Sequence, residues 1–446
     1  MTFKRKIYQQ LLSWKATPNK NSALLIEGAR RVGKTTVVQE FAKNEYRDFI
    51  YIDFTYAPDE TKKLFSRIRP FDQKSMDLFF ADLFVNYNKE LHRGDLIIFD
   101  EVQNFPIARQ AIKALVQDGR FDYIETGSLI SIRENTLSIQ IPSEEKRIEM
   151  YPMDFEEFKW ALGDETSCKL LREMLKQGSI SQSVHQKMMD DYRLYLSLGG
   201  MPKVVASYLE NGSFFIAAEE KKNISELYVD DLRKHDNSCQ SESLAIYLSS
   251  FASLRSWSKR TKTGIRDEST ELRYIRSLGD LEDSRMVNAV YRTADLSFGN
   301  LVKDRTMFKL YPLDAGLMLN DLLGEKGESS QEAYRKIRFG SLAGANYGLL
   351  YECAVAEALK ANGHELYYHV FESEKGTRHE IDFVSYINGR LSAIEVKSTN
   401  RFTVSSLDAL TRKYPQLKID RIVVSPKPLS RSNNVLYLPL YLTYLL

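Results

Sequence analysis

A glycine-rich segment near the N-terminus constrains the fold of this 446-residue chain more than any other feature. Residues 28–35 read Gly-Ala-Arg-Arg-Val-Gly-Lys-Thr and follow the apolar run Leu24–Ile26. This pattern is typical of a phosphate-binding loop, where glycines let backbone N–H groups surround a phosphate. The helical composition of residues 36–43 would place that phosphate at a helix N-terminus. We therefore expect a nucleoside triphosphate site, with a chance glycine-rich turn as the alternative.

Individual residues of this loop have expected roles. Lys34 is predicted to contact the β- and γ-phosphates, and the Thr35 hydroxyl to bind Mg²⁺. The other nucleotide-binding candidates in the loop are Gly28, Arg31, Gly33 and Thr36. Arg31 can equally be a solvated charge, because it occupies a variable loop position.

A second acidic motif follows the apolar run Leu96–Phe99. Four apolar residues in a row indicate a strand buried on both faces, and the two carboxylates that end it need a cation nearby. We expect Asp100 to hold Mg²⁺ and Glu101 to be the catalytic base that polarises the attacking water. The alternative is a strand followed by a helix N-cap.

Further hydroxyl and arginine side chains are candidates for sensing the γ-phosphate. Thr126 and Ser128 follow the apolar pair Tyr123-Ile124, although Ser128 is equally a helix N-cap. Arg147 is a candidate for an arginine finger, with a surface arginine as the alternative.

Length and composition limit the class of protein. The chain is too long for one ordinary core, and its length predicts about two to four domains. The 62 Lys and Arg nearly balance the 60 Asp and Glu, so the net charge of +2 neither favours nor excludes nucleic acid. Three widely spaced cysteines favour a reducing cytoplasm, and we expect no secretion signal and no membrane anchor.

Motif order suggests four segments. Residues 1–150 alternate short apolar runs with helical segments, as a doubly wound ATPase core would, and residues 151–235 form a helical region with a helix end at 199–202. Residues 236–325 suit a winged-helix arrangement, with a first wing strand at 286–291. Basic residues cluster there and favour DNA contact about as much as a solvated helix face: Lys259, Arg260, Lys262, Arg266, Arg273 and Arg276.

The last segment, residues 326–446, carries a second chemical motif. Strand alternation places Glu395 and Lys397 on one face, and a neighbouring strand would add Asp382. Two carboxylates can hold Mg²⁺ or Mn²⁺ while an ammonium group orients water, which suits hydrolysis of a phosphodiester. The spacing resembles the catalytic core of PD-(D/E)xK nucleases. That resemblance implies Asp382, Glu395 and Lys397 as catalytic residues and Glu352 as a further metal ligand from the first helix.

The order of all these motifs resembles that of a widespread prokaryotic family of AAA-type ATPases. The shared motifs are the P-loop, the strand ending at Asp100-Glu101, Thr-Gly-Ser at 126–128, Pro-Met-Asp-Phe-Glu-Glu-Phe at 152–158, Gly-Gly-Met-Pro at 199–202, and the acidic segments at 380–383 and 394–397. The resemblance covers nearly the whole chain. It implies an α/β fold with a P-loop NTPase core (AAA+ or STAND-like) that binds ATP, a winged-helix middle and a restriction-endonuclease-like C-terminal domain.

Three functions fit this organisation. The first is a Mg²⁺-dependent ATPase coupled to a nuclease-like domain that acts on DNA. The second is a signalling-type switch ATPase whose catalytically silent C-terminal domain binds a protein partner. The third is a metal-dependent nuclease licensed by ATP. Assembly into a homo-oligomer, with hydrolysis in trans, stays open.

Overall fold

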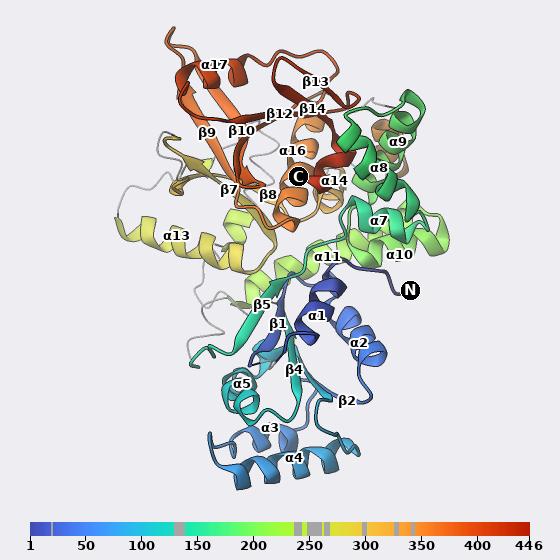
Figure 1. The fold of residues 1–446 in the computed structure, drawn as a ribbon, viewed down its shortest axis with the longest axis vertical. Coiled ribbons are helices and arrows are strands. Elements are labelled where there is room, and N and C mark those ends of the chain that lie inside the picture. The colour runs from blue at the N-terminus through green and yellow to red at the C-terminus, as the bar shows by residue number, and fades with distance from the viewer. Residues whose placement is uncertain are drawn as a thin grey trace. The chain divides into compact units, whose positions relative to one another are not determined.

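The computed structural model describes residues 1–18, 21–128, 139–235, 243–247, 261–262, 268–296, 301–324, 330–339 and 344–446. The chain divides into two compact units (Figure 1). Unit 1 comprises residues 1–151 with 283–285, and unit 2 comprises residues 152–282 with 286–446. Each unit has a sheet of its own.

Unit 1 is built on a parallel sheet, which confirms the predicted P-loop NTPase-like core. The strands described in this unit lie in the order β2-β3-β4-β1-β5. Their bounds are β1 (Ala23–Glu27), β2 (Phe49–Asp53), β3 (Leu96–Asp100), β4 (Asp122–Gly127) and β5 (Glu145–Glu149). The helices are α1 (Ile7–Lys15), α2 (Lys34–Glu45), α3 (Asp59–Phe65), α4 (Gln73–Tyr87), η1 (Val102–Asn104) and α5 (Pro106–Asp118).

The sequence of unit 1 explains these elements. All five residues of β1 and of β3 are buried, as continuous apolar runs covered on both faces should be. Figure 1 shows α2 on one face of the sheet and α5 on the other. Because β4 pairs in parallel with both β1 and β3, the carboxyl ends of these three strands lie at the same edge of the sheet, with β4 in the middle.

Unit 2 begins with a series of helices. These are α7 (Phe155–Ala161), α8 (Thr166–Gln177), α9 (Gln182–Leu198), α10 (Pro202–Asn211) and α11 (Phe214–His235). Asp154 and Glu157 form a capping box that starts α7. The predicted helix end at 199–202 is confirmed. Gly200 is required there, because a Cβ on it would lie 2.1 Å from the Met153 carbonyl oxygen.

The rest of unit 2 is organised around a mixed sheet. Its described strands run in the order β13-β14-β12-β11-β10-β9-β7-β8-β6. Their bounds are β6 (Thr261–Lys262), β7 (Val287–Thr293), β8 (Asp304–Pro312), β9 (Tyr367–Glu372), β10 (Arg378–Ile387), β11 (Arg390–Val396), β12 (Asp420–Ser425), β13 (Ser430–Ser432) and β14 (Val435–Pro439). The helices are α13 (Glu268–Asp283), α14 (Ala315–Gly324), α15 (Ser330–Arg338), α16 (Gly344–Ala361), α17 (Ser405–Lys413) and η2 (Leu440–Leu445).

This sheet joins two segments that the sequence analysis separates at residue 325. The expected wing strand corresponds to β7, which pairs antiparallel with β8 and parallel with β9. Segments 236–325 and 326–446 thus share one sheet. Of the expected basic cluster, Lys259, Arg260 and Arg266 lie outside the described residues. Among the described residues, no helix is long and apolar enough to cross a membrane.

Candidate functional site

The P-loop connects β1 to α2 and wraps around the Lys34 side chain. Arg31 and Gly33 have positive φ angles of 69° and 101°, and α2 begins directly after Gly33. The buried Lys34 ammonium donates hydrogen bonds to the carbonyl oxygens of Gly28 at 2.7 Å and Ala29 at 2.9 Å. Burial lowers the pKa of Lys34 to about 8, although the carboxylates of Glu101 and Asp100 act in the opposite direction. The side chains of Arg31 and Thr36 are exposed.

Asp100 lies at the centre of a hydroxyl network at the end of β3. Thr35 Oγ1 donates to Asp100 Oδ2 at 2.8 Å, which joins the P-loop to the acidic strand end. The Tyr51 hydroxyl, from β2, donates to the same oxygen, and Thr126, from the end of β4, donates to Oδ1. Three neighbouring strands and the P-loop therefore orient one buried carboxylate. Thr35 and Asp100 together offer the hard oxygen ligands that Mg²⁺ prefers.

Glu101 is held separately from Asp100. Its backbone is left-handed, with φ of 51°, and its side chain accepts a hydrogen bond from the Gln103 amide. Ser128 Oγ lies 3.5 Å from Glu101 Oε2. The two adjacent carboxylates thus have different partners, and fewer hydrogen bonds hold Glu101 than Asp100.

Other groups of unit 1 support the loop. Arg5, which precedes α1, donates to the carbonyl oxygens of Val32 at 2.7 Å and Tyr151 at 2.6 Å. Gly28 lies so close to the end of β5 that a Cβ on it would be 2.3 Å from the carbonyl oxygen of Met150, the residue after that strand. The loop is therefore clamped from both sides, and this close approach requires glycine at position 28.

A buried charge cluster lies on the strands beside the site. Arg109 of α5 forms a bidentate ion pair with Glu145 of β5, at 2.8 and 2.9 Å. Arg147 lies 3.6 Å from Glu145 and 3.9 Å from Glu27. Glu125 of β4 is fully buried, and burial raises its pKa well above the ordinary value. Arg147 thus has two acidic neighbours within its own unit.

The predicted C-terminal motif comes together on β10 and β11. The register pairs Phe383 with Ile394, so Asp382 and Glu395 occupy the next opposed positions, on one face. Lys397 Nζ lies 2.6 Å from Glu395 Oε2, as expected for side chains on the same face. Asp382 Oδ2 accepts a hydrogen bond from the Val396 N–H at 2.9 Å. Burial raises the pKa of Glu395, and Lys397 opposes that shift.

Glu352 does not join these two carboxylates in a three-ligand group. Among the described residues, no cluster of three or more His, Cys, Asp or Glu side chains could hold a metal ion. The physical reason is that the buried Glu352 of α16 accepts a hydrogen bond from the Tyr311 hydroxyl at 2.7 Å. In addition, Lys309 of β8 lies 2.8 Å from Glu380 and 3.8 Å from Asp382, so an ammonium group already faces the carboxylates.

Several of these site residues escaped the sequence analysis. Tyr51, Arg5, Lys309 and Tyr311 reach their sites only through the fold, because each lies far along the chain from its partner. Gln103 could have been found, since it is two residues from Glu101 and carries an amide donor.

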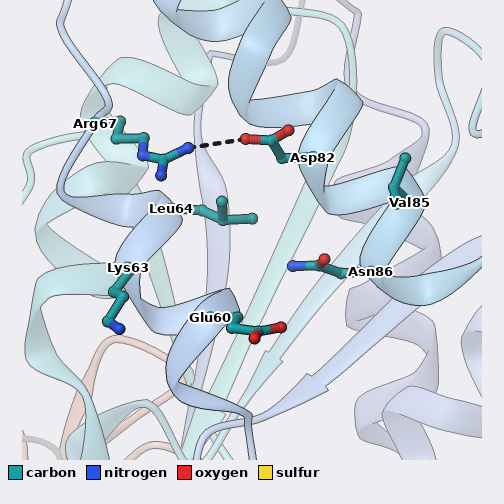
Figure 2. A pocket seen from close by; sticks show the side chains of 7 residues that line it. All are labelled: Glu60, Lys63, Leu64, Arg67, Asp82, Val85 and Asn86. Carbon is teal, nitrogen blue, oxygen red and sulfur yellow. Dashed lines mark hydrogen bonds and ion pairs between the residues drawn. The ribbon is translucent and has the colours of Figure 1, made fainter.

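Figure 2 shows a hollow elsewhere on unit 1, between α3 and α4. It is lined by Glu60, Lys63, Leu64, Arg67, Asp82, Val85 and Asn86. Arg67 and Asp82 form an ion pair of 3.0 Å at its edge. None of the sequence-predicted site residues lines it, so the hollow is separate from the nucleotide site.

Comparison with family models assigns the N-terminal part of the chain. Residues 20–159 match the model of an AAA domain. Residues 189–329 and 347–441 match two models, each described as a domain of unknown function (DUF8612 and DUF4143). A comparison with curated proteins found no match. The AAA match, the parallel sheet and the P-loop geometry define residues 20–159 as an AAA-type P-loop ATPase domain.

Two solved structures are similar to this chain at low sequence identity. The Walker-type ATPase PABY2304 of Pyrococcus abyssi is 17% identical, with a TM-score of 0.41, over 72% of this chain and 95% of that one. Cdc6p from Pyrobaculum aerophilum is 15% identical, with a TM-score of 0.24, over 75% of this chain and 94% of that one.

Proposed function

We propose that the chain is a Mg²⁺-dependent ATPase and that its ATP hydrolysis is coupled to a nuclease-like C-terminal region. The substrate of that region would be DNA. The contact between Thr35 and Asp100 carries the ATPase part, because it brings the P-loop hydroxyl and the acidic strand end within 2.8 Å. Bound Mg·ATP would supply the reactive phosphoryl group and the charge that polarises it.

The residues of unit 1 divide the work of hydrolysis. Lys34 and the backbone of the loop bind the phosphates, and Thr35 and Asp100 hold the magnesium ion. Glu101 accepts the proton of the attacking water, because it is the less constrained of the two carboxylates. Thr126 and Ser128, which contact Asp100 and Glu101, are proposed to sense the γ-phosphate through these partners.

The nuclease-like part rests on the opposed carboxylates of β10 and β11. Among the described residues, the buried Oε1 of Glu395 has no hydrogen-bond partner, and a divalent cation between Glu395 and Asp382 would satisfy it. Mg²⁺ or Mn²⁺ suits this pair of oxygen ligands, and Lys397 would then orient water. In the middle segment, α13 followed by the antiparallel pair β7 and β8 supports the winged-helix interpretation.

A second candidate function is a switch ATPase with a silent C-terminal region that binds a protein partner. The position of Lys309 favours it, because this buried ammonium lies against Glu380 and Asp382. Together with Lys397 it balances the carboxylates without a metal ion. In that case the region would be a docking surface rather than an active site.

Nucleotide binding and phosphate release test the ATPase proposal directly. The full chain should bind ATP and release phosphate in the presence of Mg²⁺. Lys34→Ala should bind ATP at least about tenfold more weakly, since it removes a charge-assisted contact of about 1.5–3 kcal/mol. Unchanged ATP affinity in Lys34→Ala would disprove the assignment of the site.

A further inference from the structure

The turn between α13 and β7 belongs to unit 1. Residues 283–285 lie there, although the rest of α13 and all of β7 belong to unit 2. Arg285 in this turn has a left-handed backbone, with φ of 60°, which is uncommon for a residue other than glycine. Such a conformation persists where surrounding contacts hold it. For Arg285 these contacts include two ion pairs, and both carboxylates belong to unit 1.

The first ion pair of Arg285 reaches the start of the P-loop. Its guanidinium Nη2 lies 3.5 Å from Oε2 of Glu27. Glu27 is the last residue of β1, so it directly precedes Gly28, the first residue of the loop. The Glu27 side chain is only 6% exposed, so solvent screens this interaction little. Arg285 therefore helps to fix the strand end from which the P-loop begins.

The second ion pair, with Glu149, reaches the other side of the loop. Glu149 is the last residue of β5, and it also accepts a hydrogen bond from the Tyr151 hydroxyl. Arg5 donates to the Tyr151 carbonyl oxygen at 2.6 Å and to the carbonyl oxygen of Val32, a P-loop residue, at 2.7 Å. Consecutive contacts within unit 1 thus connect Arg285 to both sides of the P-loop.

We propose that Arg285 is a positioning residue of the nucleotide site and that the turn at 283–285 is held more firmly when ATP binds. A bound triphosphate needs the backbone N–H groups of the loop in one arrangement, and both routes make that arrangement depend on Arg285. Linkage is reciprocal, so ATP must stabilise the turn as strongly as the turn stabilises bound ATP. This inference rests on the proposed ATP site and is independent of any DNA substrate.

The position of the turn carries the response towards the sheet of unit 2. β7 begins at Val287, directly after the turn, and pairs in parallel with β9. β9 pairs with β10, which carries Asp382. A turn that ATP holds in place therefore also restrains the start of a strand in the sheet of the candidate nuclease residues.

Steady-state ATP hydrolysis by the full chain tests the positioning role. Arg285→Ala should raise KM several-fold and leave kcat nearly unchanged, because the loop still adopts the binding arrangement but does so less often. Partial unfolding would instead lower kcat without raising KM. Arg285→Lys should recover part of the loss, since an ammonium group keeps the charge but not the fork of donors. An unchanged KM in Arg285→Ala would overturn the positioning role.

Arg292→Ala is the matched control variant. Arg292 lies on β7, its side chain is 36% exposed against 28% for Arg285, and it forms an ion pair with Asp304 of β8. The substitution removes a comparable paired arginine close along the chain, and KM for ATP should stay at the wild-type value. A rise equal to that of Arg285→Ala would contradict a specific role for Arg285.

Amide hydrogen exchange tests the response of the turn itself. A non-hydrolysable ATP analogue with Mg²⁺ should slow exchange several-fold in residues 283–287 of the wild type, as well as in the P-loop. In Arg285→Ala at saturating analogue, the P-loop should still be protected, while the turn should no longer respond. A turn that does not respond in the wild type, or that responds equally in Arg285→Ala, would reject the proposal.

Glu149→Gln keeps the test decisive if Arg285→Ala does not fold. It removes the charge that pairs with Arg285 but keeps the shape of a side chain that is 39% exposed. KM should rise and the turn should lose its response, and no change in either would count against the proposal. A wild type that binds the analogue without a response of the turn refutes this inference alone. A wild type that binds no ATP refutes the nucleotide site as well, and absence of DNA cleavage alters neither measurement.

Discussion

At the scale of single residues, two adjacent carboxylates differ through their partners. Asp100 accepts hydrogen bonds from hydroxyls of the P-loop, β2 and β4, which fix it beside Thr35. Glu101 accepts a hydrogen bond from Gln103 and lies near Ser128, and its backbone is left-handed. These different partners are the basis for proposing Asp100 as the magnesium ligand and Glu101 as the base that activates water.

Replacement of Glu101 should separate binding from turnover. We expect Glu101→Gln to bind ATP with nearly wild-type affinity, because the amide keeps the shape of the side chain. Turnover should fall about 10²- to 10⁴-fold, since an amide cannot accept the proton of the water. Nucleotide titration and phosphate release measure the two effects. A variant with normal turnover would transfer the role of the base to another residue.

The pKa of Lys34 predicts proton uptake when ATP binds. Burial places this pKa at about 8 in the free protein, and the added phosphate charge should raise it. Above about pH 8, ATP therefore binds a partly neutral lysine and must recruit a proton, so affinity should fall as the pH rises. Titration calorimetry at pH 8.5 in two buffers of different ionisation enthalpy measures this uptake, at about half a proton or more.

Lys34→Arg is the control for this effect. Its guanidinium stays charged throughout the range, so any nucleotide that it binds should be bound without proton uptake. Equal heats in both buffers for the wild type would contradict the lowered pKa.

At the scale of elements, a bidentate ion pair between Arg109 and Glu145 links α5 to β5. Both side chains are almost fully buried, with exposed fractions of 2% and 1%. Arg109→Ala would leave the buried Glu145 carboxylate with the longer contact to Arg147 at 3.6 Å, so the loss of stability should be at most about 3–5 kcal/mol, the value typical of a broken buried ion pair. Denaturant unfolding of unit 1 should show this loss.

The double variant tests whether the stability contributions of Arg109 and Glu145 are coupled. Adding Glu145→Ala to Arg109→Ala should destabilise the protein by less than the sum of the two single changes, because neither charge remains unpaired. Additive losses would show that the two side chains act independently.

At the scale of the whole molecule, the proposals differ in what ATP does to unit 2. If the chain is an ATPase–nuclease, DNA cleavage with Mg²⁺ or Mn²⁺ should disappear in Asp382→Ala and in Glu395→Ala. Lys34→Ala should remove cleavage only if ATP licenses it. A gel-based cleavage assay with and without ATP gives each result. Absence of cleavage under every condition, with intact ATP turnover, would favour the switch ATPase.

The local parts of the fold could be predicted from the sequence because their signals are local. The P-loop lies within eight consecutive residues, 28–35, and the run before Asp100 has the composition of a buried strand. Strand alternation also placed Glu395 and Lys397 on one face, where they lie 2.6 Å apart. In each case, neighbouring residues along the chain make the contact.

The tertiary structure decided the rest, because those contacts join residues that the sequence keeps far apart. Strand order brings Tyr51 and Thr126 to Asp100, and the shared sheet of unit 2 brings Lys309 beside Asp382. The same sheet joins segments on either side of residue 325, which motif order had suggested to be separate. By itself, the sequence determined which chemical groups this protein has. Only the packing of distant strands determined which of those groups share a site and offset one another's charge.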